Sequence, residues 1–101
     1  MKPVAELNAL GSGRFSITGE LGFDTVRGHL SASEPVFKEP GRIEIDLAGI
    51  THGDSAGLAL LIEWLRRATL AGKDLQYTGV PEQLRALARL SDVEEVLPLG
   101  A

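Results

Sequence analysis

The sequence contains no cysteine and only five aromatic residues, namely one tryptophan, one tyrosine and three phenylalanines, in 101 residues. The lack of cysteine excludes disulfide bonds, thiolate metal ligands and thiol nucleophiles, and it fits a reducing compartment. The longest apolar stretch, around LALLIEWL, is too short and too charged to cross a bilayer. The opening residues, MKPVAEL, include an acid and no long apolar run, so we expect no secretory signal. These features favour a cytoplasmic chain that does not insert into a membrane.

The remaining composition is that of an ordinary globular protein. Apolar residues make up 44% of the chain and charged residues 24%, which is usual for a soluble domain. The length predicts one domain over residues 1–101, with a modest core. The formal net charge of −4 argues against nucleic acid and anionic membrane surfaces as direct partners.

Alternation of apolar and polar residues predicts the strands. Residues 4–10 and 14–18 alternate on either side of Gly11-Ser12-Gly13, which predicts an antiparallel hairpin. Residues 42–47 and 75–78 show the same pattern. A strand covered on both faces would read as a continuous apolar run, so alternation predicts one face open to water or a partner. We therefore expect an α/β fold with a mixed sheet and helices on one face, and not a doubly wound nucleotide-binding sheet.

Four further segments are assigned from helical spacing and from their caps. Residues 23–33 predict a helix with Asp24 or Thr25 as its cap, and prolines 35 and 40 bracket a loop. Residues 56–71 predict the principal helix, which ends at Gly72. Another helix should start at Pro81 and run to about residue 90. Residues 91–97 fit either a short helix or a strand.

The principal helix has apolar residues on two sides. At about 100° per residue, one arc should face the sheet. That arc holds Leu58, Leu61, Ile62, Leu65 and Thr69. The roughly opposite side holds Leu60, Trp64 and Ala71, together with Glu63 and Arg67. Either a neighbouring helix covers Trp64, or Trp64 anchors an exposed protein-binding patch.

The polar stretch HGDSAG, residues 52–57, leads into this helix. Asp54 or Ser55 can cap it, and Gly57 permits close backbone approach. His52 is expected to be solvated. Asp46 and Asp54 both lie near the strand–helix junction, where they could pair as carboxylates for catalysis. No nucleophile, second histidine or basic group sits at useful spacing, so we expect neither catalysis nor a metal. The GSG turn lacks the helix and lysine of a phosphate-binding loop.

Three phrases of the sequence resemble the STAS domain family, named after sulphate transporters and anti-sigma-factor antagonists. They are IDLAGITHGDSAGLALLIEWLRRA (residues 45–68), SITGEL (16–21) and LAGKDLQYTGVPEQLRALARL (70–90). The resemblance spans roughly residues 4–97. It implies a single STAS domain with four or five strands in a mixed sheet and helices on one face. Many STAS domains have aspartate after GEL, whereas this chain has Gly22.

Two branches of the family compete. The helix GLALLIEWLRRA and the ending LPLG are more similar to the small cytoplasmic subunit of the Mla or toluene-tolerance phospholipid-trafficking ABC transporter. That resemblance implies a non-catalytic adaptor without a cofactor, which binds and regulates or stabilises the ATPase subunit and maintains outer-membrane lipid asymmetry. Through the ATPase it would lie at the inner membrane beside a permease. The alternative is an anti-sigma-factor antagonist, a phospho-switch in which Ser55 would be phosphorylated by an anti-sigma serine kinase.

The partner-binding and regulatory residues implied by the resemblance and by the helix pattern surround the start of the principal helix. They are His52, Asp54, Ser55, Gly57, Leu58, Leu60 and Trp64. A small hydrolase or nucleotide-binding protein is the remaining class, and the sequence supplies few residues for it.

Overall fold

The computed structural model describes residues 6–38 and 41–100, which form a four-stranded sheet in the order β1-β2-β3-β4. β1 (Glu6–Gly11) pairs antiparallel with β2 (Arg14–Leu21), and β3 (Ile43–Gly53) runs parallel to both β2 and β4 (Leu75–Thr78). The predicted hairpin and mixed sheet are confirmed, although residues 4 and 5 of the first predicted strand lie outside the described residues. The hairpin turn needs its glycines because three successive residues, 11–13, have positive φ angles.

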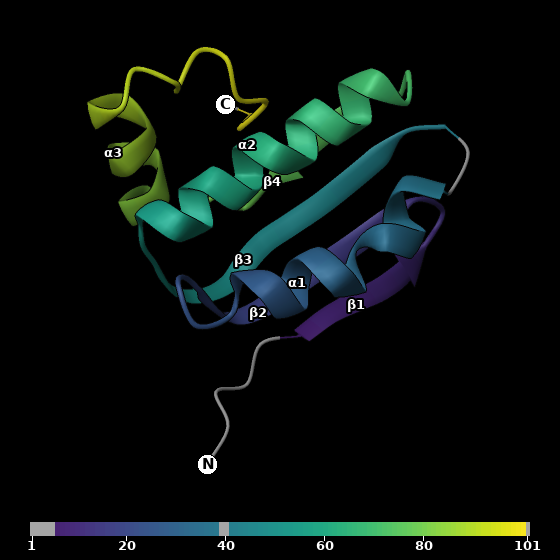
Figure 1. Ribbon diagram of the computed structural model, residues 1–101, viewed down its shortest axis with the longest axis horizontal. Coiled ribbons are helices and arrows are strands. Elements are labelled where there is room, and N and C mark those ends of the chain that lie inside the picture. The colour runs from purple at the N-terminus through teal and green to yellow at the C-terminus, as the bar shows by residue number, and fades with distance from the viewer. Residues whose placement is uncertain (1–5, 39–40, 101) are drawn as a thin grey trace.

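The helices cover one face of this sheet. α1 (Val26–Ala32) and α2 (Ser55–Leu70) run side by side in front of it (Figure 1), and the 3-10 helix η1 (Glu34–Lys38) follows α1. α3 (Glu82–Leu90) lies against the end of β3, where Leu84 packs on Gly53. The opposite face of the sheet carries half-exposed polar residues at alternate positions. These are Ser16, Thr18, Glu44, Asp46, Gln76 and Thr78. The prediction of a sheet with one covered face is therefore confirmed.

The core fills the space between the sheet and the helices. Strand residues that alternate with the polar face are buried, and in the register Phe15 lies opposite Ile45, which lies opposite Tyr77. The Tyr77 hydroxyl donates to the carbonyl of Leu61 at 2.7 Å. This bond satisfies the one polar group of a fully buried ring and joins β4 to α2.

β3 is longer than the sequence pattern predicted. Alternation stops at Leu47, but pairing continues because residues 18–21 of β2 lie opposite residues 49–53 of β3, with two shifts in register. Residues 48–53, which the alternation left outside the predicted strand, therefore also belong to β3. As a result, Asp46 lies opposite Thr78, whereas Asp54 follows the far end of β3, roughly 25 Å away at about 3.3 Å per residue. The suggested pairing of these two carboxylates is wrong.

α2 has one buried face and not two. Its buried residues are Gly57, Leu58, Leu60, Leu61, Trp64 and Ala68. They form a single arc centred on Leu61, so the sheet covers one flank of the arc and α1 covers the other. Ile62, placed on the sheet-facing arc, is 41% exposed, and Thr69 and Ala71 are also exposed. The helix ends as predicted, at Gly72 with a φ of 69°.

Residues 91–97, predicted as a short helix or a strand, form turns, and none of the described residues 91–100 is helix or strand. Leu97 and Leu99 are buried, and between them the carbonyl of Pro98 accepts a hydrogen bond from the backbone N–H of Tyr77 at 2.9 Å. The Gln76 side chain donates to the same carbonyl at 3.1 Å. The C-terminal segment, residues 97–100, therefore lies along the outer edge of β4.

Candidate functional site

Asp54 connects the start of α2 to the turn after β2. Its Oδ1 accepts hydrogen bonds from the N–H groups of Ala56 (2.9 Å) and Gly57 (3.1 Å), so it caps the helix as predicted. Its Oδ2 accepts from the N–H of Phe23 at 3.1 Å. The hydrogen bond from Phe23, followed by that from Gly57, lowers the pKa of the Asp54 carboxyl below its ordinary value. The carboxylate is thus fixed as an anion with both oxygens engaged.

Two glycines allow these segments to approach one another. A Cβ at Gly57 would overlap the carbonyl oxygen of Leu21, so the predicted close approach is confirmed, and it is made by β2 of the same chain. A Cβ at Gly22 would lie 2.7 Å from the Asp54 Oδ2. Where many STAS domains have aspartate, this chain therefore has the residue that leaves room for Asp54 to reach Phe23.

Ser55 is exposed at the first position of α2. Because Asp54 supplies the cap, the Ser55 hydroxyl is not required to hold the helix, and of the two candidate caps the helix uses Asp54.

The turn after β2 and the end of β3 enclose an acidic hollow of about 200 Å³. Its lining comprises Glu20, Gly22, Phe23, Asp24, Thr25, His52 and Asp54. Phe23 is 80% exposed at its rim. The Thr25 hydroxyl fixes the floor, because it accepts from the N–H of Gly22 at 3.0 Å and donates to the carbonyl of Glu20 at 2.9 Å. His52 is exposed as expected, but it lies in β3 opposite Glu20 and not in a turn.

An apolar groove lies between α1 and α2 and continues from this hollow, since Val26 follows Thr25 and Ala56 lies two residues after Asp54. It has a volume of about 280 Å³. We call it the α1–α2 groove, and its lining comprises Val26, Arg27, Leu30, Ala56, Ala59, Leu60 and Glu63. The two charged members lie on opposite helices.

A comparison with protein families adds to this geometry. A family model described as "Mlab, STAS domain" matches residues 7–99. The chain belongs to the STAS domain family. The match covers nearly the whole chain and supports a STAS domain of the MlaB-like type, as the resemblance indicated. A search of curated proteins gave no significant match. STAS domains are in general binding and adaptor domains and not enzymes.

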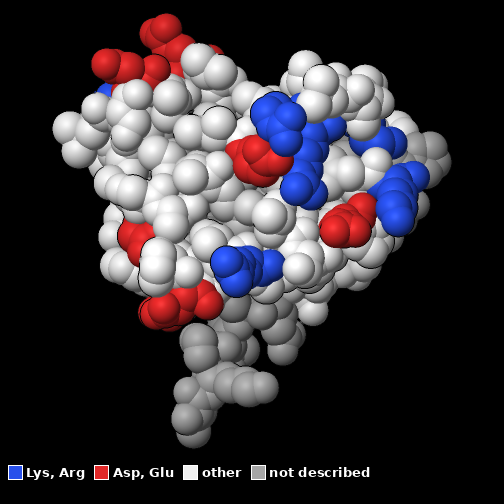
Figure 2. All heavy atoms as spheres, in the orientation of Figure 1, with Lys and Arg blue, Asp and Glu red and all other residues white. Residues whose placement is uncertain are grey.

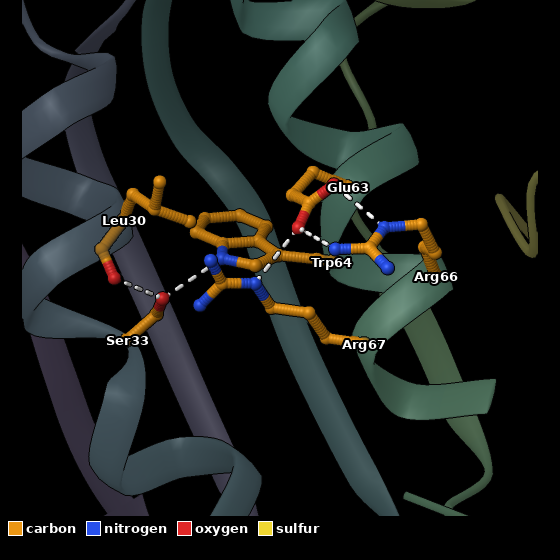
Figure 3. Close-up of polar contacts among 6 residues, drawn as sticks. All are labelled: Leu30, Ser33, Glu63, Trp64, Arg66 and Arg67. Atoms are coloured by element: carbon orange, nitrogen blue, oxygen red, sulfur yellow. Dashed lines mark hydrogen bonds and ion pairs between the residues drawn. The ribbon is translucent and has the colours of Figure 1, made fainter. Parts of the chain in front are cut away.

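Trp64 of this STAS domain is fully buried, with an exposed fraction of 0%. Its indole Nε1–H donates to the Ser33 hydroxyl at 2.9 Å, and that hydroxyl donates to the carbonyl of Leu30 at 2.7 Å (Figure 3). The explanation that a neighbouring helix covers Trp64 is therefore confirmed, and the exposed patch anchored on Trp64 is wrong. The sequence could not distinguish a covered Trp64 from an exposed one, because the helix that covers it, α1, lies about 30 residues earlier in the chain.

The structure separates the seven predicted interface residues into two groups. His52 and Ser55 are exposed and Asp54 is half-buried, and the three are brought together where β3 meets α2. Gly57, Leu58, Leu60 and Trp64 are buried. The buried four lie beneath this surface, and of them Leu60 also lines the α1–α2 groove.

Three residues of this region were not selected from the sequence. Phe23 and Thr25 line the hollow because the hydrogen bond to Asp54 holds their turn against the start of α2. No short sequence motif identifies them as site residues. His29 is buried in α1, with its Nε2 3.2 Å from the carbonyl oxygen of Glu20. Burial lowers the pKa of the His29 imidazole, an effect that this hydrogen bond partly opposes.

An ion-pair cluster lies on α2 beside the groove. Glu63 accepts from Arg66 at 2.7 Å and from Arg67 at 2.9 Å (Figure 3). These two hydrogen bonds lower the pKa of the Glu63 carboxyl to about 2. In the part of the chain that the structure describes, no group of three or more His, Cys, Asp or Glu side chains is placed to hold a metal ion. No helix among those described residues has the length and apolar character needed to span a membrane.

Proposed function

We propose that this STAS domain is a non-catalytic adaptor that binds the ATPase subunit of a bacterial phospholipid-transport ABC complex and regulates or stabilises it. The MlaB-like type of the family match supports this branch. In this role the domain would lie at the cytoplasmic face of the inner membrane, reach the permease only through the ATPase, and contribute to outer-membrane lipid asymmetry.

The observation that carries the proposal is the rigid, accessible surface at the start of α2. Three backbone N–H groups hold Asp54 in place, and this fixes the turn that carries Phe23 beside the exposed Ser55. A surface built before the partner arrives loses little conformational freedom on binding. The same bonds argue against a hydrolase, because a carboxylate with both oxygens engaged by backbone amides is not free to orient the His52 imidazole toward Ser55.

The exposed Ser55 also fits the alternative, an anti-sigma-factor antagonist. A phosphate there would add roughly two negative charges. The N-terminus of α2 would stabilise them, but the Asp54 carboxylate and the acidic hollow would repel them. Because Asp54 makes the cap, phosphorylation would change the docking surface and leave the helix folded.

The test measures affinity for the cognate ABC-transporter ATPase, using purified wild type, Ser55→Ala and Ser55→Glu. We expect Ser55→Ala to bind within about threefold of wild type and Ser55→Glu to bind more than about tenfold more weakly, since a larger side chain in a close-packed contact commonly costs more than 1.4 kcal/mol. Thr69→Glu, at an exposed position in the last turn of α2, is the matched control and should bind normally.

Equal affinity of Ser55→Glu and wild type would remove Ser55 from the interface. Co-purification followed by mass spectrometry separates the two branches. An ABC ATPase recovered in stoichiometric amount supports the adaptor, whereas a serine kinase that modifies Ser55 supports the phospho-switch.

A further inference from the structure

We infer that the α1–α2 groove takes an amphipathic helix of the partner, lying antiparallel to α2 with its basic C-terminal end over the acidic hollow. The inference rests on the proposed function only for the identity of the protein that supplies this helix, namely the ATPase.

The shape and lining of the groove fit a helix. α1 and α2 run in the same direction, with their N-termini at the same end of the molecule (Figure 1). Between them, Leu60 forms a buried floor, and Val26 and Leu30 are half-buried walls. On the α2 side the wall is made of Ala56 and Ala59, whose small side chains leave room for another backbone. A third helix would place apolar side chains at i, i+3, i+4 and i+7 along this floor.

The two ends of the groove carry opposite charge. Beyond the helix N-termini lie three carboxylates of the acidic hollow, from Glu20, Asp24 and Asp54. Arg27 in the first turn of α1 offsets only one of them, so this end is net acidic. At the other end, Arg66 and Arg67 share the single carboxylate of Glu63, which leaves an excess positive charge. Figure 2 shows acidic side chains at the lower left of this face and most of the basic ones toward the right.

This charge distribution selects the direction of the incoming helix. Helices favour acidic residues in the first turn and basic residues in the last turn, because these complement the helix dipole. An antiparallel helix therefore places its basic last turn over the acidic hollow and its acidic first turn beside Arg66 and Arg67. A parallel helix would bring like charges together at both ends.

Phe23 extends the contact at the acidic end. Its ring is 80% exposed and its backbone is held by Asp54. A lysine or arginine in the last turn of the incoming helix could lie over this ring while it pairs with the carboxylates.

The first experiment maps the contact with a photo-cross-linking amino acid at position 59, in the full chain bound to its ATPase. Position 69, exposed at the other end of α2, is the matched control. We expect position 59 to cross-link to one ATPase helix that has apolar residues at helical spacing and lysine or arginine in its last turn, and position 69 not to cross-link there. A cross-link from position 59 to an extended segment or to a helix with an acidic last turn would overturn the proposal. So would a normal complex without any cross-link from position 59.

The second experiment compares affinities. Ala59→Gln fills the groove at an exposed position and should weaken binding at least about tenfold, since an overfilled contact commonly costs more than 1.4 kcal/mol. Thr69→Gln should bind within about twofold of wild type. Asp24→Lys tests direction and should weaken binding roughly threefold at low salt, whereas Glu95→Lys, at an exposed position after α3, should not.

Thermal unfolding of each variant shows whether a loss of binding reflects a loss of folding. If wild type binds the ATPase and Ala59→Gln binds equally well, the groove proposal fails and the adaptor function stands. If wild type does not bind the ATPase at all, the proposed function itself fails.

Discussion

Ser33 holds the single tryptophan in position. Its hydroxyl is fully buried between the indole N–H of Trp64 and the carbonyl of Leu30, so one side chain joins the end of α1 to the middle of α2. Because no water reaches this place, the indole N–H has no substitute acceptor if the hydroxyl is removed. The packing of α1 on α2, and with it one wall of the α1–α2 groove, therefore depends on a hydrogen bond.

Ser33→Ala should lower the free energy of unfolding by about 1–3 kcal/mol, the cost of a buried donor without a partner. Ser31→Ala, in the same helix at an exposed position, should change it by less than about 0.5 kcal/mol. Urea unfolding followed by the fluorescence of Trp64 measures both, and the same signal should resist acrylamide quenching in the folded wild type. Equal unfolding midpoints for the two variants would contradict the role given to Ser33.

His29 makes stability depend on pH. Burial holds its folded-state pKa below the ordinary 6.5, so the unfolded chain binds a proton more readily than the folded chain. The free energy of unfolding should therefore be greatest above about pH 6.5 and decrease as the pH falls from that value toward the lower folded-state pKa.

The measurement is urea unfolding at several pH values between about 5.5 and 7.5, where the carboxyl groups contribute least. His29→Gln should remove most of the decrease in this interval, and His52→Gln, which changes an exposed imidazole, should keep it. A His29→Gln curve parallel to that of wild type would show that another group is responsible.

At the scale of elements, the junction between β2 and α2 depends on a helical glycine. Alanine normally stabilises a helix interior relative to glycine by about 1 kcal/mol. Gly57 lies against the carbonyl of Leu21, whereas Gly28 of α1 has no atom within 4 Å of the position a Cβ would take. The same substitution should therefore have opposite effects in the two helices.

Gly57→Ala should destabilise the domain by about 1–3 kcal/mol through overpacking, and Gly28→Ala should stabilise it by roughly 0.5–1 kcal/mol. Thermal and urea unfolding of both variants give the comparison. A stabilising Gly57→Ala would mean that α2 can move away from β2 at little cost.

Local patterns in the sequence were enough to predict most helices and strands. The errors occurred where contacts between distant parts of the chain determine the structure. Ile43, Ile45 and Leu47 identified the start of β3, but its last six residues pair with β2 through register shifts that no alternation reveals. Asp54 was identified as a cap because that role is local. The hydrogen bond that Asp54 accepts from Phe23, 31 residues earlier, could not be identified from the sequence. The α1–α2 groove was missed for the same reason, since its two walls are distant in sequence.

At the scale of the whole molecule, the sheet has two edges, and the C-terminal segment covers one of them. β4 has only four residues, and on its outer side the Pro98 carbonyl accepts from the Tyr77 N–H. Arg85 of α3 secures the segment by donating to the Leu99 carbonyl at 2.9 Å. An uncovered strand edge invites pairing with other chains.

Deleting residues 97–101 should therefore both destabilise the domain and promote self-association. The loss of the buried side chains of Leu97 and Leu99 should cost about 3–6 kcal/mol, at about 1.5–3 kcal/mol for each. Light scattering and thermal unfolding detect the two effects separately. Leu97→Ala, which keeps the backbone over β4, is the control that should lose stability and remain monomeric. A truncated chain as monomeric as this variant would show that the edge needs no cover.

The parallel pairing of β3 has a consequence for the order of folding. β3 lies between β2 and β4, and it is separated from them along the chain by residues 22–42 and 54–74. Closing loops of this length costs entropy before any strand contact compensates for it. Of the described strand pairs, only the β1–β2 hairpin can therefore form from neighbouring residues as the chain leaves the ribosome. β3 can pair with β2 only after the 21 intervening residues and β3 itself have left the ribosome, and its other edge stays unpaired until β4 has followed.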